Sequence, residues 1–141
     1  MKKTQALGMI LLLAFSFCVS LKRAEANSLA TVSVLPSEIT VENVGERVSV
    51  NITISDVVNL SAYEVKIFYN STQLDALWTI LPTNHFLKPL AGEIFYIAEN
   101  TTDNVYNVTH KFVWFSGTLA PPENARSGSG ILIQIVFDAL A

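Results

Sequence analysis

Cysteine, histidine and charged residues are all scarce in this sequence, and each scarcity excludes a class of protein. Cys18 is the only cysteine, so no disulfide can form within the chain. His85 and His110 are the only histidines, and no Cys, Asp or Glu lies near either one at the spacing of a metal-binding motif. Charged residues make up 15% of the chain and form no basic patch, which makes nucleic acid a poor partner.

The motifs of common enzymes are absent as well. The sequence contains no Gly-x-Ser-x-Gly, no HExxH and no phosphate-binding loop. It also lacks the Asp-x-Asp-x-Asp run of an EF-hand calcium loop. The acidic residues are scattered, mostly in expected turns, where solvation explains them better than a pair of glycosidase carboxylates does. We therefore expect no enzyme, no metal and no cofactor, and we expect each histidine to lie at the surface or in a strand.

The longest apolar run lies at the N-terminus. Two lysines precede residues 6–21, which are all apolar or small, and residues 24–26 read Ala-Glu-Ala. A charged start, an apolar stretch and a small-residue site predict a secretory signal peptide. We expect cleavage to remove residues 1–26 and residues 27–141 to form one domain.

The same stretch has two other interpretations. An uncleaved membrane anchor needs about 20 apolar residues, and this run has 16. A lipoprotein signal is disfavoured because Phe17, rather than a small residue, precedes Cys18. Without residues 1–26 the chain has 115 residues, of which five are basic and 11 acidic, so its net charge is 5 − 11 = −6. It then has no cysteine, and a secreted domain of this size must be held by its hydrophobic core alone.

The remaining chain alternates apolar and polar residues with a period of two, which predicts β-strands. We expect strands at 31–35, 38–42, 47–54, 61–69, 78–81, 92–98, 105–119 and 131–138. Turns or loops are expected at 43–46, 56–59, 70–72, 82–91, 100–104 and 120–130. No segment shows convincing helical periodicity. About eight or nine strands with short connections indicate an all-β fold, either a sandwich or a jelly roll.

One stretch, residues 59–77, organises the predicted core. Its alternating strand has one face expected in the core, formed by Ser61, Tyr63, Val65, Ile67 and Tyr69. The opposite face is expected to point outward and consists of Ala62, Glu64, Lys66 and Phe68.

Aromatic residues are concentrated at 112–115, which reads Phe-Val-Trp-Phe and is apolar on both faces of its strand. One of these faces belongs in the core, where we also expect Trp78. The other face is either covered by a loop or exposed as a patch that binds a sugar ring or a protein partner.

Five N-x-[ST] sequons begin at Asn51, Asn59, Asn70, Asn100 and Asn107. In a chain with a signal peptide, this density predicts surface glycosylation. Asn51 and Asn107 are expected within strands, opposite their apolar neighbours, so glycans there would keep those faces in solvent.

Four motifs follow one another in a fixed order along the chain. They are Val-Ser-Val-Leu-Pro at 32–36, Val-Gly-Glu at 44–46, the alternating strand and clasp at 60–74, and the glycine-led strand at 128–137. In this order they resemble the cohesin module family. The resemblance implies a nine-stranded jelly-roll β-sandwich, related in fold to cellulose-binding modules, with no catalytic role. Asn-Ser at 70–71 stands where the family has Asp-Pro, which changes mainly the turn.

The resemblance also implies a dockerin module as the partner and places the contacting strand positions near Ala62 and Glu64. Ala62 offers no polar side chain, whereas Glu64 and Lys66 do. We therefore expect partner binding through Ala62, Glu64, Lys66 and Phe68. The module would be secreted or at the cell surface, within an extracellular assembly related to polysaccharides. Direct carbohydrate binding, with a polysaccharide as partner, and a structural surface-layer spacer are the alternatives.

Overall fold

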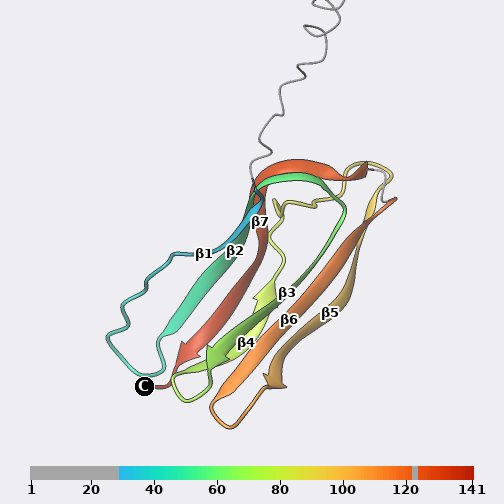
Figure 1. Ribbon diagram of the computed structural model, residues 1–141. Helices are drawn as coiled ribbons and strands as arrows, with labels where there is room; N and C mark the ends of the chain where they lie inside the picture. Colours follow the sequence, from blue (N-terminus) through green and yellow to red (C-terminus); the bar gives the residue numbers. More distant parts are fainter. Residues whose placement is uncertain (1–28, 122–123) are drawn as a thin grey trace, which may run out of the picture.

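The computed structural model describes residues 29–121 and 124–141, and its elements are strands (Figure 1). The expected signal peptide at 1–26 lies outside the described residues. The strands are β1 (Thr31–Leu35), β2 (Arg47–Leu60), β3 (Ala62–Asn70), β4 (Leu74–Ile80), β5 (Ile94–Val105), β6 (His110–Ala120) and β7 (Arg126–Ala139).

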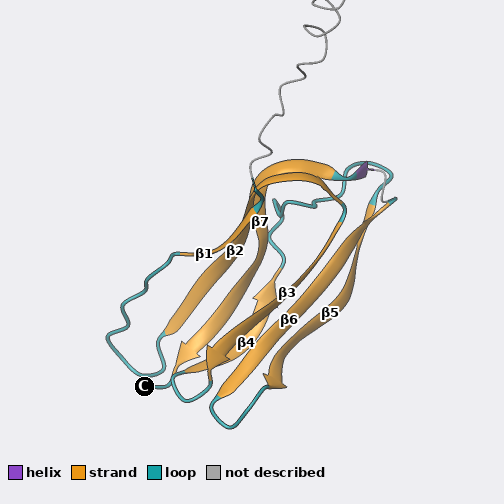
Figure 2. Ribbon diagram, in the orientation of Figure 1, coloured by secondary structure: helices purple, strands orange, loops and turns teal. Residues whose placement is uncertain are grey.

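The strands form two antiparallel sheets that enclose one core. The first sheet has the order β1-β2-β7-β4, and the second has the order β3-β6-β5. Figure 2 shows the long strands lying side by side, with the loop after β1 and the loop after β4 running alongside them. The predicted all-β sandwich is confirmed. The expected count of about nine strands is not, because seven strands lie in the described part of the chain.

Residues 56–59, expected to be a loop, continue β2 instead. Asp56 and Asn59 each have a positive φ of 56°, and the register between β2 and β7 shifts twice in this region. Irregular positions of this kind bend a strand without ending it. The segment is held because β7 begins earlier than expected, so that Gly128 pairs with Val57. The amides of Asp56 and Asn59 donate to the hydroxyls of Ser129 and Ser127, both at 3.0 Å.

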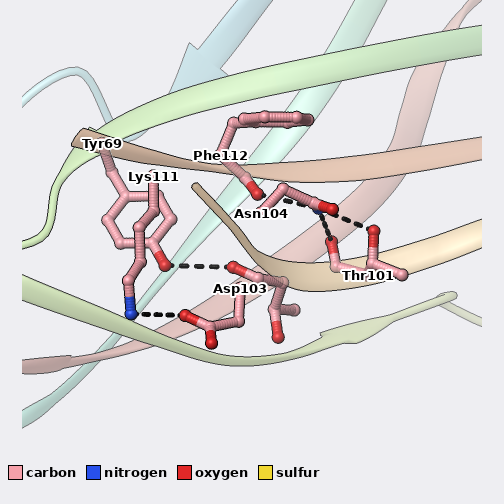
Figure 3. Close-up of polar contacts among 7 residues, drawn as sticks. Tyr69, Thr101, Asp103, Asn104, Lys111 and Phe112 are labelled. Carbon is pink, nitrogen blue, oxygen red and sulfur yellow. Dashed lines mark hydrogen bonds and ion pairs between the residues drawn. The ribbon is translucent and has the colours of Figure 1, made fainter. Parts of the chain in front are cut away.

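The predicted turn at 100–104 is also wrong, because these residues belong to β5. The register between β5 and β6 shifts between Thr101 and Asn104, which marks a bulge. The Asn104 side chain holds this bulge by donating to Thr101 Oγ1 at 2.7 Å and to the Phe112 carbonyl at 3.1 Å (Figure 3). The chain instead reverses at 106–109, so the strand expected over 105–119 begins only at His110.

Residues 38–42 alternate like a strand but form none. A strand needs a neighbour that accepts its main-chain hydrogen bonds, and here β2 already lies between β1 and β7. Val41 is half-buried, and with Val34, Pro36 and Ile39 it lines a groove of about 260 Å³ beside β2.

The core lies between the inner faces of the two sheets. Its most deeply buried members are Ile52, Val113, Phe115, Leu132, Ile133 and Ile135. Leu132 breaks the alternation of the inward Ile133 and Ile135. It is buried because Ile52 pairs with Ile133 while Thr53 pairs with Ile131, which leaves Leu132 as the extra residue of a bulge.

Trp78 is 43% exposed, so its expected place in the core is wrong. A register shift between Ala76 and Trp78 makes Leu77 the extra residue and changes the face on which the indole lies. The Arg47 guanidinium lies 4.9 Å from the indole centroid, an arrangement favourable to a cation–π contact.

Candidate functional site

The outward face of β3 carries the four residues expected to bind a partner. Ala62, Glu64, Lys66 and Phe68 are exposed, and the intervening Tyr63, Val65, Ile67 and Tyr69 are half-buried or buried. The period-two alternation of β3 is therefore confirmed residue by residue. The strand is straight enough to hold it because its pairing with β6 runs from Ala62 to Asn70 without a register shift.

The neighbouring strand β6 widens this surface. The register places Thr118, Ser116, Trp114 and Phe112 of β6 beside the four outward residues of β3. We call these eight residues the β3–β6 face. Val113 and Phe115 point to the opposite side and are completely or almost completely buried.

An aromatic cluster, formed by Phe68, Tyr106 and Phe112, occupies one end of the β3–β6 face. The Phe68 ring centroid lies 5.0 Å from that of Tyr106 and 5.3 Å from that of Phe112. Phe68 is 52% exposed and Tyr106 66% exposed. With Asn107 and His110, Phe68 and Tyr106 line a hollow of about 280 Å³.

Tyr106 is a site residue that the sequence did not indicate. It was expected near the start of the strand at 105–119, but the turn at 106–109 folds it back over Phe68. The signal was present in the Asn-Val-Thr sequence of the turn. Asn107 Oδ1 accepts hydrogen bonds from the amides of Thr109 and His110, both at 2.9 Å, which is how Asn stabilises a turn.

Charges occupy the middle of the face. Lys66 Nζ lies 3.1 Å from Glu64 Oε1 and 4.5 Å from the Trp114 ring centroid. Trp114 and Phe112 are half-buried. Neither of the two interpretations of this aromatic strand holds in full, because both rings keep part of their surface open while Lys66 partly covers Trp114. Because both charged side chains are about half exposed, their ion pair contributes little to stability.

Small side chains form the other end of the face. Ala62, Ala98, Ser116 and Gly117 are among the residues that line a shallow hollow of about 400 Å³. The face therefore has an aromatic end, a charged centre and a hollow end.

Two contacts hold the β5 bulge against the strands that carry Phe68 and Phe112. Tyr69 donates its hydroxyl hydrogen to the Thr102 carbonyl at 3.0 Å, and Lys111 forms an ion pair with Asp103 (Figure 3). Burial raises the pKa of Tyr69, which keeps the phenol in its donating form. These contacts fix the end of β5 against β6, where Phe112 stands.

The two histidines have different surroundings. His85 is buried with its ring 4.8 Å from Phe95, so its expected place at the surface or in a strand is wrong. Burial, and to a lesser degree Lys88, lowers its pKa. His110 begins β6, and its Nδ1 lies 2.9 Å from Thr109 Oγ1. Among residues 29–121 and 124–141, no three His, Cys, Asp or Glu side chains gather in a way that could hold a metal ion.

The five sequon asparagines are not equally accessible. Asn59, Asn100 and Asn107 are exposed, whereas Asn51 and Asn70 are half-buried. Asn51 lies within β2 as expected, and its Oδ1 accepts from Gln134 Nε2 at 3.3 Å. Asn107 was expected in a strand and lies in a turn instead. In the described part of the chain, no helix is both long and apolar enough to cross a bilayer.

Comparison with known proteins agrees with the motif order. The family model of the cohesin domain matches residues 32–141, which is most of the chain. No curated protein and no solved structure shows a significant match. Because the match spans both sheets and every described strand except the first residue of β1, this chain belongs to the cohesin domain family.

Proposed function

We propose that this cohesin domain is a non-catalytic assembly module that binds a dockerin-type protein through the β3–β6 face. Cohesin domains are in general protein-binding modules whose partners are dockerins. Ala62, Glu64, Lys66 and Phe68 supply the contacts from β3, and Phe112 and Trp114 supply them from β6. The Ala62 position contributes surface shape, and the charged centre contributes the polar contacts.

The observation that carries this proposal is the exposure of aromatic rings at one end of the β3–β6 face. Phe68 and Tyr106 are each more than half exposed. Exposed apolar patches of this kind mark interaction sites, and aromatic anchors are enriched at the centres of protein interfaces. Lys66 and Glu64 lie beside the rings and provide charges that select the partner.

The geometry of the rings disfavours direct sugar binding. A sugar platform needs aromatic rings that lie in one plane and face the solvent. The Phe68 plane is inclined by 77° to that of Tyr106 and by 37° to that of Phe112. The same cluster is well suited to an apolar side chain of a protein, which can insert between inclined rings.

Capture of a dockerin module tests the assignment. The chain is immobilised and exposed to dockerin modules encoded by the same genome. The double variant Glu64→Arg with Phe68→Ala is expected to lose capture while its thermal unfolding midpoint is retained. A matched control, Val32→Ala, changes an exposed apolar residue of the other sheet and is expected to bind normally. Equal capture by the double variant and the parent chain would contradict the role of this face.

The cellular setting follows from the sequence rather than from the fold. A signal peptide at 1–26 and five sequons support a secreted or cell-surface glycoprotein that works in an extracellular, polysaccharide-related assembly. Glycans are proposed first at the exposed Asn59, Asn100 and Asn107. The mass of the chain purified from its native source, before and after enzymatic deglycosylation, tests both cleavage after Ala26 and the use of the sequons.

A further inference from the structure

The free edge of β3 differs from the other sheet edges of this molecule. β3 is the outermost strand of its sheet, with β6 on one side (Figure 1). Its ladder runs unbroken over nine residues without a bulge or proline. The other edges are protected: β1 has five residues and is followed by Pro36, while β4 and β5 contain register shifts. Proteins commonly protect edges by such devices, and β3 lacks them apart from its charged side chains.

The direction of the main-chain groups along β3 follows from two hydrogen bonds at its ends. The Leu119 amide donates to the Ser61 carbonyl at 2.7 Å, and the Ser71 amide donates to the Thr109 carbonyl at 2.9 Å. In an antiparallel ladder without shifts, hydrogen-bonded pairs recur at every second residue. The odd-numbered residues therefore bond to β6. The even-numbered residues, Ala62, Glu64, Lys66 and Phe68, direct their amides and carbonyls to the free edge, where no described main-chain group meets them.

We propose that β3 pairs with β3 of a second copy of this chain, antiparallel about a two-fold axis through Val65. In this register Glu64 lies opposite Lys66 of the other copy, and Val65 lies opposite itself. Ala62 lies opposite Phe68, so a small side chain meets a large one. All four pairs of even-numbered residues exchange main-chain hydrogen bonds, and the two sheets become one continuous sheet.

Charge complementarity selects this register among those compatible with the hydrogen-bond pattern. The compatible registers differ by two residues. A shift of one strand by two residues in either direction puts Glu64 opposite Glu64 or Lys66 opposite Lys66. Larger shifts leave both charges opposite uncharged residues. Only the axis through Val65 places both glutamates opposite lysines. Opposite charges stabilise a cross-strand pair, and like charges destabilise it. Within each copy Lys66 already lies 3.1 Å from Glu64, so four charges of alternating sign form a square across the axis.

This association differs from dockerin binding in its main contact, the main-chain edge of β3, although the Glu64 and Lys66 side chains that select its register also belong to the outward face. It would place two β3–β6 faces next to each other on one surface. Edge pairing buries little apolar area, so the dimer is expected to be weak and dependent on concentration.

Sedimentation velocity of the full chain over rising concentration tests the proposal. Glu64→Lys and Lys66→Glu each place like charges opposite one another twice per dimer and are expected to weaken dimerisation by about tenfold or more. The double variant Glu64→Lys with Lys66→Glu restores opposite charges and is expected to dimerise like the parent chain. A chain that stays monomeric at every concentration overturns the proposal, and so does a double variant that dimerises no better than the single ones.

A crosslink tests the register without relying on charge. With Cys18 replaced by serine, Val65→Cys places two thiols opposite each other in a non-hydrogen-bonded pair. The Cα separation of about 4.5 Å in such pairs lies within the range for a disulfide. Oxidation is expected to give a covalent dimer. The matched variant Ile67→Cys, opposite Tyr63 in the same register, is expected to stay uncrosslinked. Equal crosslinking at 65 and 67 overturns the register.

Discussion

The Tyr63 hydroxyl donates a hydrogen bond to the Leu132 carbonyl at 2.9 Å and so joins the two sheets of the sandwich. Tyr63 lies in β3, and Leu132 is the extra residue of the β7 bulge. The phenol ring also stacks between Phe95 and Phe115, with centroids 6.1 and 5.8 Å away. Burial raises the pKa of Tyr63, so the hydroxyl stays protonated and able to donate.

Removal of this hydroxyl should lower stability without disturbing packing. Tyr63→Phe keeps the ring but leaves the carbonyl of a buried residue without its partner, which costs about 1–2 kcal/mol in free energy of unfolding. Chemical denaturation of parent and variant measures the difference. Tyr96→Phe is the control, because Tyr96 is 52% exposed and its change should stay within about 0.5 kcal/mol. An equal effect of both substitutions would show that the link between the sheets contributes nothing.

Gly117 permits the close packing of Phe95 against β6. A Cβ at this position would lie 2.3 Å from Phe95 Cζ, well inside van der Waals contact. The ring cannot move freely because Tyr63 and His85 lie against it. Gly117→Ala is therefore expected to cost about 1–3 kcal/mol in free energy of unfolding.

A second substitution separates this clash from other effects of alanine at residue 117. Phe95→Leu shortens the side chain that the new Cβ meets. In the Phe95→Leu background, Gly117→Ala should cost clearly less than it does alone, as a double-mutant cycle of unfolding free energies would show. Strict additivity of the two changes would exclude the predicted clash.

His85 should make the stability of the domain depend on pH below neutrality. Its pKa is lowered from the ordinary value of 6.5, first by burial and then by Lys88. The unfolded chain therefore binds a proton at this residue more readily than the folded chain does. The contribution of neutral His85 to stability is fully present above about pH 6.5 and is lost as the pH drops through the folded-state pKa.

Thermal unfolding midpoints between neutral pH and mildly acidic pH measure this loss. His85→Gln should flatten the pH dependence, even if it lowers the midpoint at neutral pH. The control His110→Gln should keep the slope of the parent chain. If His85→Gln leaves the slope unchanged, another group is responsible for it.

The Glu93 carboxylate joins the loop before β5 to the start of β7. It accepts a hydrogen bond from the Leu90 amide at 2.7 Å and forms an ion pair with Arg126. The Leu90 amide is the largest cause of its lowered pKa, and Arg126 adds to it. Because the folded pKa lies below the ordinary 4.5, the stabilisation is present above that pH and is lost as the pH falls through the folded value.

Glu93→Gln tests this coupling in acid. The variant should be less stable than the parent chain at neutral pH, and the difference should shrink as the pH drops well below 4.5. Glu38→Gln, in the exposed segment after β1, is the control and should follow the parent chain at every pH. A constant difference between Glu93→Gln and the parent chain over the whole range would contradict the role of ionisation.

Much of the strand content was predictable from the sequence. β1 has the predicted bounds at both ends, and the inward and outward residues of β3 are as expected. The errors cluster at bulges. Trp78 was misplaced, and Leu132 interrupts the alternation of β7, because an extra residue in a strand changes which face its neighbours take. The composition of the strand does not show where that happens.

The candidate site was predictable only in part. The four outward residues of β3 follow from alternation alone, although their binding role is a proposal. Tyr106 could not be assigned to the same surface, because its position depends on where β5 ends and the turn at 106–109 begins. The exposure of Phe112 and Trp114 depends on what the rest of the chain places over them, such as the Lys66 ammonium 4.5 Å from the Trp114 ring centroid.

The sequence by itself determined that this chain is a β-sandwich of the cohesin family and which side chains of β3 face outward. Both rest on local periodicity and on the order of short motifs, which are properties of the chain before it folds. Only the tertiary structure decided where strands end and which edge stays free. Residues 38–42 alternate but have no partner, and residues 56–59 look like a loop but pair with β7. A strand exists only where a distant segment completes its hydrogen bonds, and that is a property of the folded molecule.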